Sequence, residues 1–235
     1  MDTHYANIVL DSVGSTQDEA AARFSGSPLL VVAAHQAEGR GRLNRAWVQA
    51  DRAMFSSLVY TPSAVHRGLI PLVAGLAVRE ALATTFGVEA GLRWPNDLVV
   101  GSDKVGGILV EADDERAIVG CGVNLWWSDP MPGAAGVVPT DPGPDAASML
   151  AAAWVGNFLD RGEAAPWDRE EYRAASVTIG RHVAYARGTG IAFDIAPDGA
   201  LLVDTGDGII AIHGGEVRLH DPTTLSGAAE SGESP

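Results

Sequence analysis

The chain has 235 residues, 46% of them hydrophobic and 20% charged, which predicts a packed globular protein and excludes disorder throughout. Its net charge of −14 argues against general nucleic-acid binding, which needs many lysine and arginine contacts to phosphates. No apolar run reaches the roughly 18 residues of a membrane span, and the N-terminus does not resemble a signal peptide. The single cysteine, Cys121, excludes an internal disulfide framework. We therefore expect a soluble, cytoplasmic protein without nucleic-acid or membrane partners.

The first part of the chain alternates predicted strands and helices. Hydroxyl residues followed by acids at 15–19 predict a helix start, and the Ala/Leu/Val-rich segment 69–86 predicts a long helix. Short apolar runs predict strands, and glycines and prolines between them predict loops. Up to residue 66 we expect a strand at 8–10, a helix at 15–24, a strand at 29–34, a loop at 38–45, a strand at 54–60 and a turn at 62–66. After it we expect a helix at 69–86, a strand at 92–94, a hairpin of 98–100 and 105–112, and a strand at 118–125.

The second part begins with a loop and ends in a different kind of structure. Five prolines in residues 128–147 predict a loop or flexible excursion, followed by helices at 146–159 and 167–175. From Val177 onward, short apolar pieces alternate with turns, which is typical of a small antiparallel barrel. We predict an α+β fold with a catalytic domain at 1–175, built on a central mixed sheet flanked by helices, and an all-β domain at 177–220. Residues 221–235 are small and polar, so we expect a disordered tail.

The segment Gly39-Arg40-Gly41-Arg42 follows the predicted strand 29–34. Glycine lets backbone N–H groups approach an anion closely, and arginine adds charge-assisted hydrogen bonds to phosphate or carboxylate. A solvated charge run is the alternative, but the interleaved glycines favour a mobile lid. Alone, the segment indicates only that an anion is bound.

A second motif, Arg93-Trp94-Pro95-Asn96-Asp97, presents an amide and a carboxylate where a strand ends at proline. Asp97 is a candidate Mg²⁺ ligand, because Mg²⁺ favours one or two carboxylates plus substrate oxygens. An Asx-turn that caps its own backbone is an equally good interpretation.

Lys104 is the only lysine beside fifteen arginines. A site that needs a compact ammonium group rather than a planar guanidinium would keep a lysine. The alternative is that Lys104 is only solvated, as lysines at turns usually are. The following Gly106-Gly107 pair permits a bulge or a close backbone approach. Further along, Asn124 ends a predicted strand with an amide suited to reading a polar edge such as adenine, or is an ordinary polar residue there. Cys121 lies in an apolar setting, which favours a buried small residue over a nucleophile.

Together these segments resemble the biotin–protein ligases, also called biotin–[acetyl-CoA-carboxylase] ligases. The resemblance spans about residues 8–220. The matching segments are Ser15-Thr16-Gln17, residues 36–42 with Trp47, residues 93–98, residues 104–111, residues 120–124 and Gly215-Glu216-Val217. The resemblance implies a sheet akin to class II aminoacyl-tRNA synthetases with a C-terminal SH3-like barrel. It also implies an enzyme that uses ATP and Mg²⁺ to form biotinyl-5′-AMP and then biotinylates a lysine of a biotin carboxyl carrier domain.

The resemblance assigns roles by position. The residues it implies for biotin binding are Ser15, Thr16, Gln17, Gln36, Arg40, Gly41, Arg42 and Lys104. Those implied for ATP or the adenylate are Gly39, Trp47, Asn96, Asp97 and Asn124. Lys104 and Arg42 would be the catalytic residues, offsetting the repulsion between two anionic reactants, and Asp97 would hold the metal.

Leu43-Asn44 and Arg93 depart from the family pattern, in which further Arg or Gly and a Lys are commoner at these places. The pattern begins near Ile8, so we expect no N-terminal DNA-binding domain. A lipoate–protein ligase is the enzymatic alternative, and the Gly-Arg-Gly-Arg segment and the barrel favour biotin. A non-catalytic biotin-binding regulator would be expected to lack the charged set that is present here. A tRNA-linked synthetase paralogue is disfavoured by the net charge.

Overall fold

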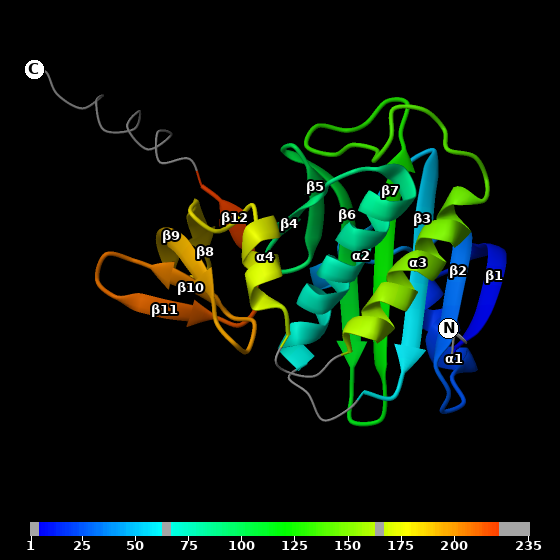
Figure 1. Ribbon diagram of the computed structural model, residues 1–235, viewed down its shortest axis with the longest axis horizontal. Helices are drawn as coiled ribbons and strands as arrows, with labels where there is room; N and C mark the ends of the chain where they lie inside the picture. The colour runs from blue at the N-terminus through cyan, green and yellow to red at the C-terminus, as the bar shows by residue number, and fades with distance from the viewer. Residues whose placement is uncertain (1–4, 63–66, 163–166, 221–235) are drawn as a thin grey trace, which may run out of the picture.

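The computed structural model describes residues 5–62, 67–162 and 167–220. The predicted tail at 221–235 and most of the predicted turn at 62–66 lie outside these residues. The described chain forms two β-sheets with helices packed mainly on the larger one (Figure 1). This mixed α/β architecture, with a large mixed sheet and a C-terminal antiparallel sheet, agrees with the predicted arrangement.

The larger sheet has seven strands in the order β1-β2-β3-β7-β6-β5-β4. Strand β1 is parallel to β2, and the other neighbouring pairs are antiparallel, so the sheet is mixed as predicted. The strands are β1 (Ala6–Val13), β2 (Leu29–Gln36), β3 (Arg52–Tyr60), β4 (Gly91–Arg93), β5 (Asp97–Val100), β6 (Asp103–Ala112) and β7 (Ala117–Trp126). Each lies where an apolar run predicted a strand.

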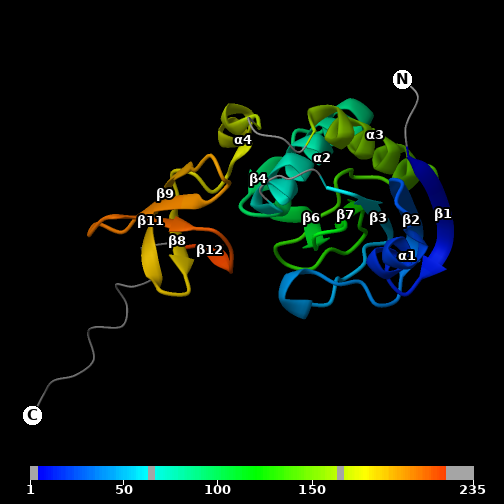
Figure 2. The same ribbon diagram turned by 90° about the horizontal axis from the view of Figure 1, so that it is seen from below.

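Two long helices, α2 (Ile70–Phe86) and α3 (Ala146–Arg161), cover one face of this sheet, and the short helix α1 (Thr16–Arg23) covers part of the other (Figure 2). Single-turn 3₁₀ helices lie at Arg42–Asn44 and Arg67–Leu69. Side-chain alternation along the strands separates the two faces. Leu30, Met54 and Leu58 join the main core under α2 and α3, whereas Val31 and Val59 pack with α1.

Helix α2 is the central core helix. It begins next to Pro71, which suits a first helical turn, and ends at Gly87 in a left-handed conformation with φ of 67°. By length and composition alone, Arg67–Phe86 is apolar enough to cross a membrane, although Arg79 and Glu80 interrupt its apolar run. In the structure, 61% of its most apolar window is buried, and a core helix passes the same test.

The smaller sheet is antiparallel, with strand order β11-β10-β9-β8-β12. Its strands are β8 (His182–Tyr185), β9 (Gly188–Ile195), β10 (Leu201–Asp204), β11 (Ile209–Ile212) and β12 (Val217–Leu219). Val183, Ile195 and Leu201 form its buried interior. Helix α4 (Arg169–Ala175) precedes it and begins two residues later than predicted, because the Asp168 side chain caps it by accepting the Glu171 N–H.

Trp94 joins the two sheets. Its side chain is 3% exposed. Its backbone N–H donates to the Thr178 hydroxyl at 2.9 Å, and its indole N–H donates to the Gly199 carbonyl at 3.0 Å. The Val177 N–H also donates to the Leu92 carbonyl at 2.9 Å. The turn that carries Asn96 and Asp97 is therefore fixed directly against the smaller sheet.

Replacing Thr178 by valine should destabilise the protein by about 1–3 kcal/mol, because it leaves the buried Trp94 N–H without its acceptor. Urea unfolding measures this free energy. The control is Thr189→Val at an exposed position of β9, where a β-branched apolar residue suits the strand. Equal unfolding free energies for the two variants would contradict this account of Trp94.

Candidate active site

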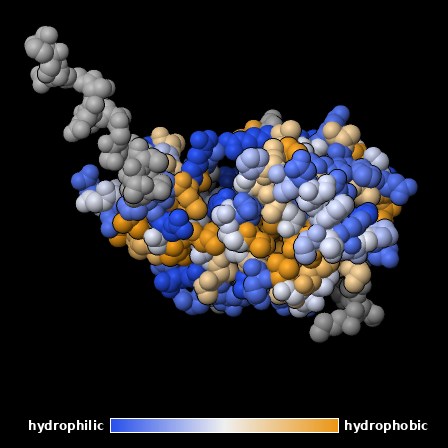
Figure 3. Space-filling model, turned by 90° about the horizontal axis from the view of Figure 1, so that it is seen from above, coloured by the Kyte–Doolittle hydropathy of each residue, from blue (hydrophilic) through white to orange (hydrophobic). Residues whose placement is uncertain are grey.

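A cavity of about 280 Å³ lies on the face of the larger sheet that carries α1. It is bounded by the start of α1, the loop 39–47, strands β3, β6 and β7, the β4–β5 turn and residues 215–217 of the smaller sheet. We call residues 39–47 the lid. Seen from above, the surface has a hollow bordered by hydrophilic residues (Figure 3).

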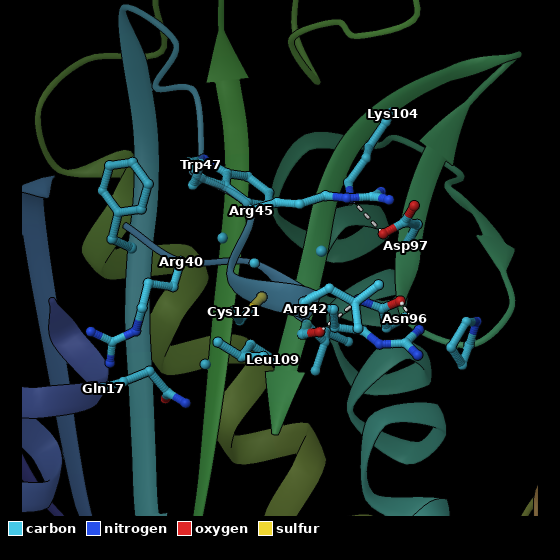
Figure 4. Close-up of a pocket in the computed structure, with 18 of the residues that line it drawn as sticks. Gln17, Arg40, Arg42, Arg45, Trp47, Asn96, Asp97, Lys104, Leu109 and Cys121 are labelled. Carbon is cyan, nitrogen blue, oxygen red and sulfur yellow. Dashed lines mark hydrogen bonds and ion pairs between the residues drawn. The ribbon is translucent and has the colours of Figure 1, made fainter. Parts of the chain in front are cut away.

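Three glycines form the floor of the cavity. A Cβ on Gly107 or Gly122 would meet the Trp47 ring at 3.2 or 3.1 Å, and a Cβ on Gly120 would meet the Gln17 side-chain oxygen at 2.9 Å. The absence of side chains on this part of β6 and β7 therefore lets Trp47 and Gln17 lie close to the sheet (Figure 4). The Trp47 indole nitrogen is buried and has no hydrogen-bond partner among the described residues.

A chain of hydrogen bonds fixes the polar end of the cavity. The Gln36 side-chain oxygen accepts the Thr16 N–H at 2.7 Å and the Thr16 hydroxyl at 3.0 Å, and the buried Ser57 hydroxyl donates to Thr16 Oγ1 at 2.8 Å. Ser15 occupies the N-cap position predicted for a hydroxyl residue, but its side chain makes no capping hydrogen bond. Gln36 satisfies the first backbone N–H of the helix in its place.

Gln17 lies beside this chain and is 5% exposed. Its amide nitrogen donates to Glu111 Oε2 at 3.3 Å, while its side-chain oxygen is buried without a partner among the described residues. A buried acceptor without a donor is costly, so this oxygen is available to a donor on a ligand.

The lid is a short hairpin with a tight tip. The Trp47 N–H donates to the Gly39 carbonyl at 2.9 Å, and the Gly41 N–H donates to the Arg45 carbonyl at 2.8 Å. At its tip, Leu43 adopts a left-handed φ of 57° and is 68% exposed. A branched apolar residue seldom takes this conformation, so the tip is the strained part of the lid. The departure from the family pattern noted in the sequence falls at this position.

The lid arginines contact three different parts of the chain. Arg40 makes a bidentate pair with Asp18 of α1 at 2.6 and 2.9 Å. Arg42 donates to Asn96 Oδ1 at 3.1 Å and to the Gly215 carbonyl at 2.8 Å, and Arg45 pairs with Glu216 at 2.7 Å. Hydrogen bonding to Arg40 lowers the pKa of Asp18, and burial lowers the pKa of Arg42. In this conformation, the lid lies against both α1 and the smaller sheet.

A second charged group, formed by Lys104 and Asp97, lies beside the β4–β5 turn. Lys104 Nζ contacts Asp97 Oδ1 at 2.5 Å and lies 5.5 Å from the centre of the Trp47 ring (Figure 4). Asn96 donates to the Ile108 carbonyl at 2.8 Å while accepting from Arg42. The Asn96 side chain therefore bonds to Arg42 and Ile108 instead of forming an Asx-turn with its own backbone.

A β-bulge aims Lys104 into the cavity. Leu98 pairs with Gly106 but Val99 pairs with Lys104, so Val105 is an extra residue on β6. Strict alternation from Gly107 would put Lys104 on the face of α2 and α3, and the extra residue returns it to the side of Gly107 and Trp47. Both roles considered for the Gly106-Gly107 segment occur. The bulge lies beside the segment, and the Trp47 ring approaches the Gly107 backbone closely.

Two family models match the chain. The model of the Biotin/lipoate A/B protein ligase family matches residues 10–125, and that of the Biotin protein ligase C terminal domain matches residues 178–219. A biotin–[acetyl-CoA-carboxylase] ligase of Mycobacterium tuberculosis is 32% identical over 89% of this chain and 87% of its own. The chain belongs to the biotin–protein ligase family. The bifunctional ligase/repressor BirA of Bacillus subtilis is 33% identical over half of this chain and 38% of its own length.

Solved ligase structures share the fold. The biotin protein ligase of Aquifex aeolicus, in complex with biotin and ATP, superposes with a TM-score of 0.76 and 26% identity over 92% of this chain and 98% of its own. The Helicobacter pylori enzyme, with bound biotinylated ATP, has a TM-score of 0.66 at 21% identity over 88% of this chain and 99% of its own, a likeness that concerns the fold.

All residues predicted for the ligase site line the cavity except Gly39 and Asn124. Gly39 packs on two residues that do line it, because a Cβ there would meet the Gln36 amide nitrogen at 3.0 Å and the Trp47 Cβ at 3.2 Å. Asn124 is 4% exposed, and alternation along β7 places it on the same side as Gly120 and Gly122. Its side-chain oxygen has no partner among the described residues. Asn124 therefore adjoins the floor without lining the described cavity.

Three residues that hold predicted site residues in place were not themselves predicted. Ser57, Asp18 and Glu111 each hold a predicted residue by a hydrogen bond or ion pair. The Ser56-Ser57 pair inside an apolar strand was the available signal, since buried hydroxyls need partners. Nothing in the sequence indicated that Asp18 or Glu111 would reach Arg40 or Gln17. Cys121 is buried as predicted, and burial raises the pKa of its thiol.

Removing the carboxylate of Asp18 should loosen the lid. Exposed ion pairs contribute about 0.2–1 kcal/mol, so Asp18→Asn is expected to speed trypsin cleavage at Arg40, Arg42 and Arg45 by about two- to fivefold. Mass spectrometry of the fragments measures these rates in the ligand-free protein. The control Glu19→Gln removes an acid from the same helical turn that pairs with Arg23 and not with the lid. Similar cleavage rates in both variants would exclude this anchoring role.

Proposed function

We propose that this ligase activates biotin with ATP to biotinyl-5′-AMP and transfers the biotinyl group to a lysine of a biotin carboxyl carrier domain. The observation that carries the proposal is the gathering of Arg42, Lys104, Asn96 and Asp97 around one cavity in a chain that belongs to this family. The Aquifex aeolicus ligase, which superposes over nearly its whole length, was solved with biotin and ATP.

In this proposal, biotin lies with its ureido ring at the α1 end of the cavity. Ser15, Thr16, Gln17 and Gln36 supply hydroxyl and amide groups there. The Gln17 oxygen, which has no partner within the described part of the chain, suits a ligand N–H. The chain of hydrogen bonds through Ser57 and Thr16 fixes the Gln36 amide before the ligand binds. Polar groups that are already oriented lose less entropy on binding, which supports specificity for the ring.

The adenylation step joins two anions, so positive charge is the main catalytic requirement. We assign Lys104 to the biotin carboxylate and the α-phosphate, and Arg42 to the phosphate of the intermediate. The carboxylate oxygen of biotin attacks the α-phosphorus, and pyrophosphate leaves. Charge-assisted hydrogen bonds placed where negative charge develops stabilise the transition state. The other lid residues, Gly39, Arg40 and Gly41, would then order over the intermediate.

Trp47 and Asn124 are proposed to receive the adenine end of the nucleotide. The Trp47 ring lies against the glycine floor, and its indole nitrogen is unpartnered among the described residues. Asn124 adjoins the same floor, and its side-chain oxygen, without a partner in the described ranges, suits the amino group of adenine. Ligand entry at this end requires Trp47 or the lid to move from the described position.

Mg²⁺ is the metal proposed for the phosphates. No three His, Cys, Asp or Glu side chains gather into a metal site in the part of the chain that the structure describes. Asp97 offers one carboxylate, and Mg²⁺ bound to nucleotides commonly takes one or two carboxylates with phosphate oxygens and water. Asp97 and the neighbouring Asn96 thus fit a metal held mainly by substrate. When bound, it would offset phosphate charge.

The finer fold assignments follow the family. We propose that the larger sheet corresponds to the class II aminoacyl-tRNA synthetase fold and the smaller to an SH3-like barrel, with the domain boundary near residue 176. The buried interior of the smaller sheet supports the second assignment. We also propose that the enzyme acts in the cytoplasm, as expected from its composition.

Biotin is favoured over lipoate by residues 178–219, which match the C-terminal domain of biotin protein ligases. Biotin-dependent exchange of pyrophosphate into ATP tests the activity directly. Exchange should require biotin and should not be supported by lipoate. Exchange with lipoate alone would replace the proposed substrate.

Lys104→Ala and Arg42→Ala should each lower the rate of biotin-dependent exchange by about 10²–10³-fold, the usual cost of one group that stabilises transition-state charge. Lys104→Arg tests whether a guanidinium can replace the compact ammonium, and we expect it to remain impaired. Arg23→Ala, on the exposed side of α1, is the control. Normal pyrophosphate release by the Lys104→Ala protein would remove the role assigned to this lysine.

A further inference from the structure

The backbone of Lys104 is held on both sides. On one side it pairs with Val99 of β5. On the other side, the pairing of β6 with β7 begins only at Gly106 and Val123. At Lys104, residues 133–135 bond to the side of β6 that β7 leaves unpaired. The Lys104 N–H donates to the Gly133 carbonyl at 2.9 Å, and the Ala135 N–H donates to the Lys104 carbonyl at 3.0 Å. Lys104 and Ala134 form a parallel bridge there.

The same segment is joined to β7 a few residues later. The Val137 N–H donates to the Asn124 carbonyl at 2.9 Å, and the Val138 N–H donates to the Leu125 carbonyl at 3.0 Å. Gly136 lies between the two sets of bonds, where a Cβ would come within 2.9 Å of the Trp126 Cα atom. The segment therefore lies between the diverging ends of β6 and β7, at the top of the sheet in Figure 1.

Both ends of the segment are anchored to the start of β3. Asp141 makes a bidentate pair with Arg52 at 2.7 and 2.9 Å. Asp51 accepts from the Ser128 N–H at 2.7 Å and from its hydroxyl at 2.8 Å. The Arg52 guanidinium and the Gly143 N–H hold the pKa of Asp141 at about 2, so this pair is charged at neutral pH. We call residues 128–141 the strap.

We propose that the strap positions Lys104 for adenylation, and that Gly136 and Asp141 are positioning residues of this ligase although neither lines the cavity. The bulge at Val105 removes Lys104 from the regular ladder with β7 and would leave its backbone groups without partners on that side. The strap supplies those partners and fixes the residue whose ammonium must meet two anions. The inference rests on the proposed function, because that function gives Lys104 its role.

The single lysine makes the test direct. Lysine-selective ¹⁵N labelling gives one backbone amide signal, that of Lys104, and its hydrogen exchange reports the bond to Gly133. In Gly136→Ala, we expect amide exchange to rise about tenfold or more, as for local opening of one segment, and the kcat of pyrophosphate exchange to fall with little change in the KM for biotin. The control Gly156→Ala lies in α3, where a Cβ meets nothing within 4 Å.

Asp141→Asn gives a milder version of the same test if Gly136→Ala does not fold. We expect a two- to fivefold change in the same two quantities, as for one exposed ion pair, with recovery in Asp141→Glu. Its control is Glu89→Gln, which breaks the comparable pair with Arg79.

The proposal would be overturned if the hydrogen exchange rate of the Lys104 amide were unchanged in both strap variants. It would also be overturned if that rate rose while the kcat of pyrophosphate exchange stayed the same. Because amide exchange requires neither biotin nor ATP, it separates failure of the strap from failure of the proposed function. If the Lys104 amide exchanges slowly but the protein shows no biotin-dependent pyrophosphate exchange, the proposed function is overturned and the role of the strap is not.

Discussion

The site depends on an area of the larger sheet that carries only glycines, because this area lets two side chains approach the backbone closely. Gly107, Gly120 and Gly122 leave one area of β6 and β7 without side chains, and Trp47 and Gln17 occupy the space. The remaining parts of the site are arranged around these two residues, because the lid carries Trp47 and α1 carries Gln17. A side chain at any of the three glycines would push the lid or the helix away from the sheet.

The bulge at Val105 is the second determinant, because it selects the face on which the only lysine appears. A regular strand would have presented Lys104 to the core under α2, where an ammonium ion is costly to bury. The extra residue brings it beside Asp97 and Trp47. A change of one residue in register thus separates a charge buried in the core from one that lies in the cavity.

Much of the fold could be predicted because its signals are local. The apolar runs gave β2, β3 and β7 within a few residues, and Gly101 allowed the tight turn of the β5–β6 hairpin. Most of the residues predicted within glycine- or proline-marked motifs also line one cavity, and Gly39 and Asn124 are the exceptions. The strap was predicted only as a loop, because its bonds to Lys104 and Asn124 are backbone contacts that no side-chain pattern encodes. Asp18 could not be paired with Arg40 either, because only the fold brings these side chains together across twenty-two residues of sequence.

The pairing of the cavity's cations has a consequence for its selectivity. Arg40, Arg45 and Lys104 are already matched by Asp18, Glu216 and Asp97. An arriving carboxylate or phosphate therefore competes with a tethered carboxylate, and its binding is an exchange of partners. A monovalent buffer anion gains little by such an exchange, because the tethered group loses less entropy on pairing. A molecule that offers several negative oxygens together with a ring for Trp47 or Gln17 can displace more than one carboxylate at once. At these three cations, carboxylates of the chain itself thus compete with simple anions.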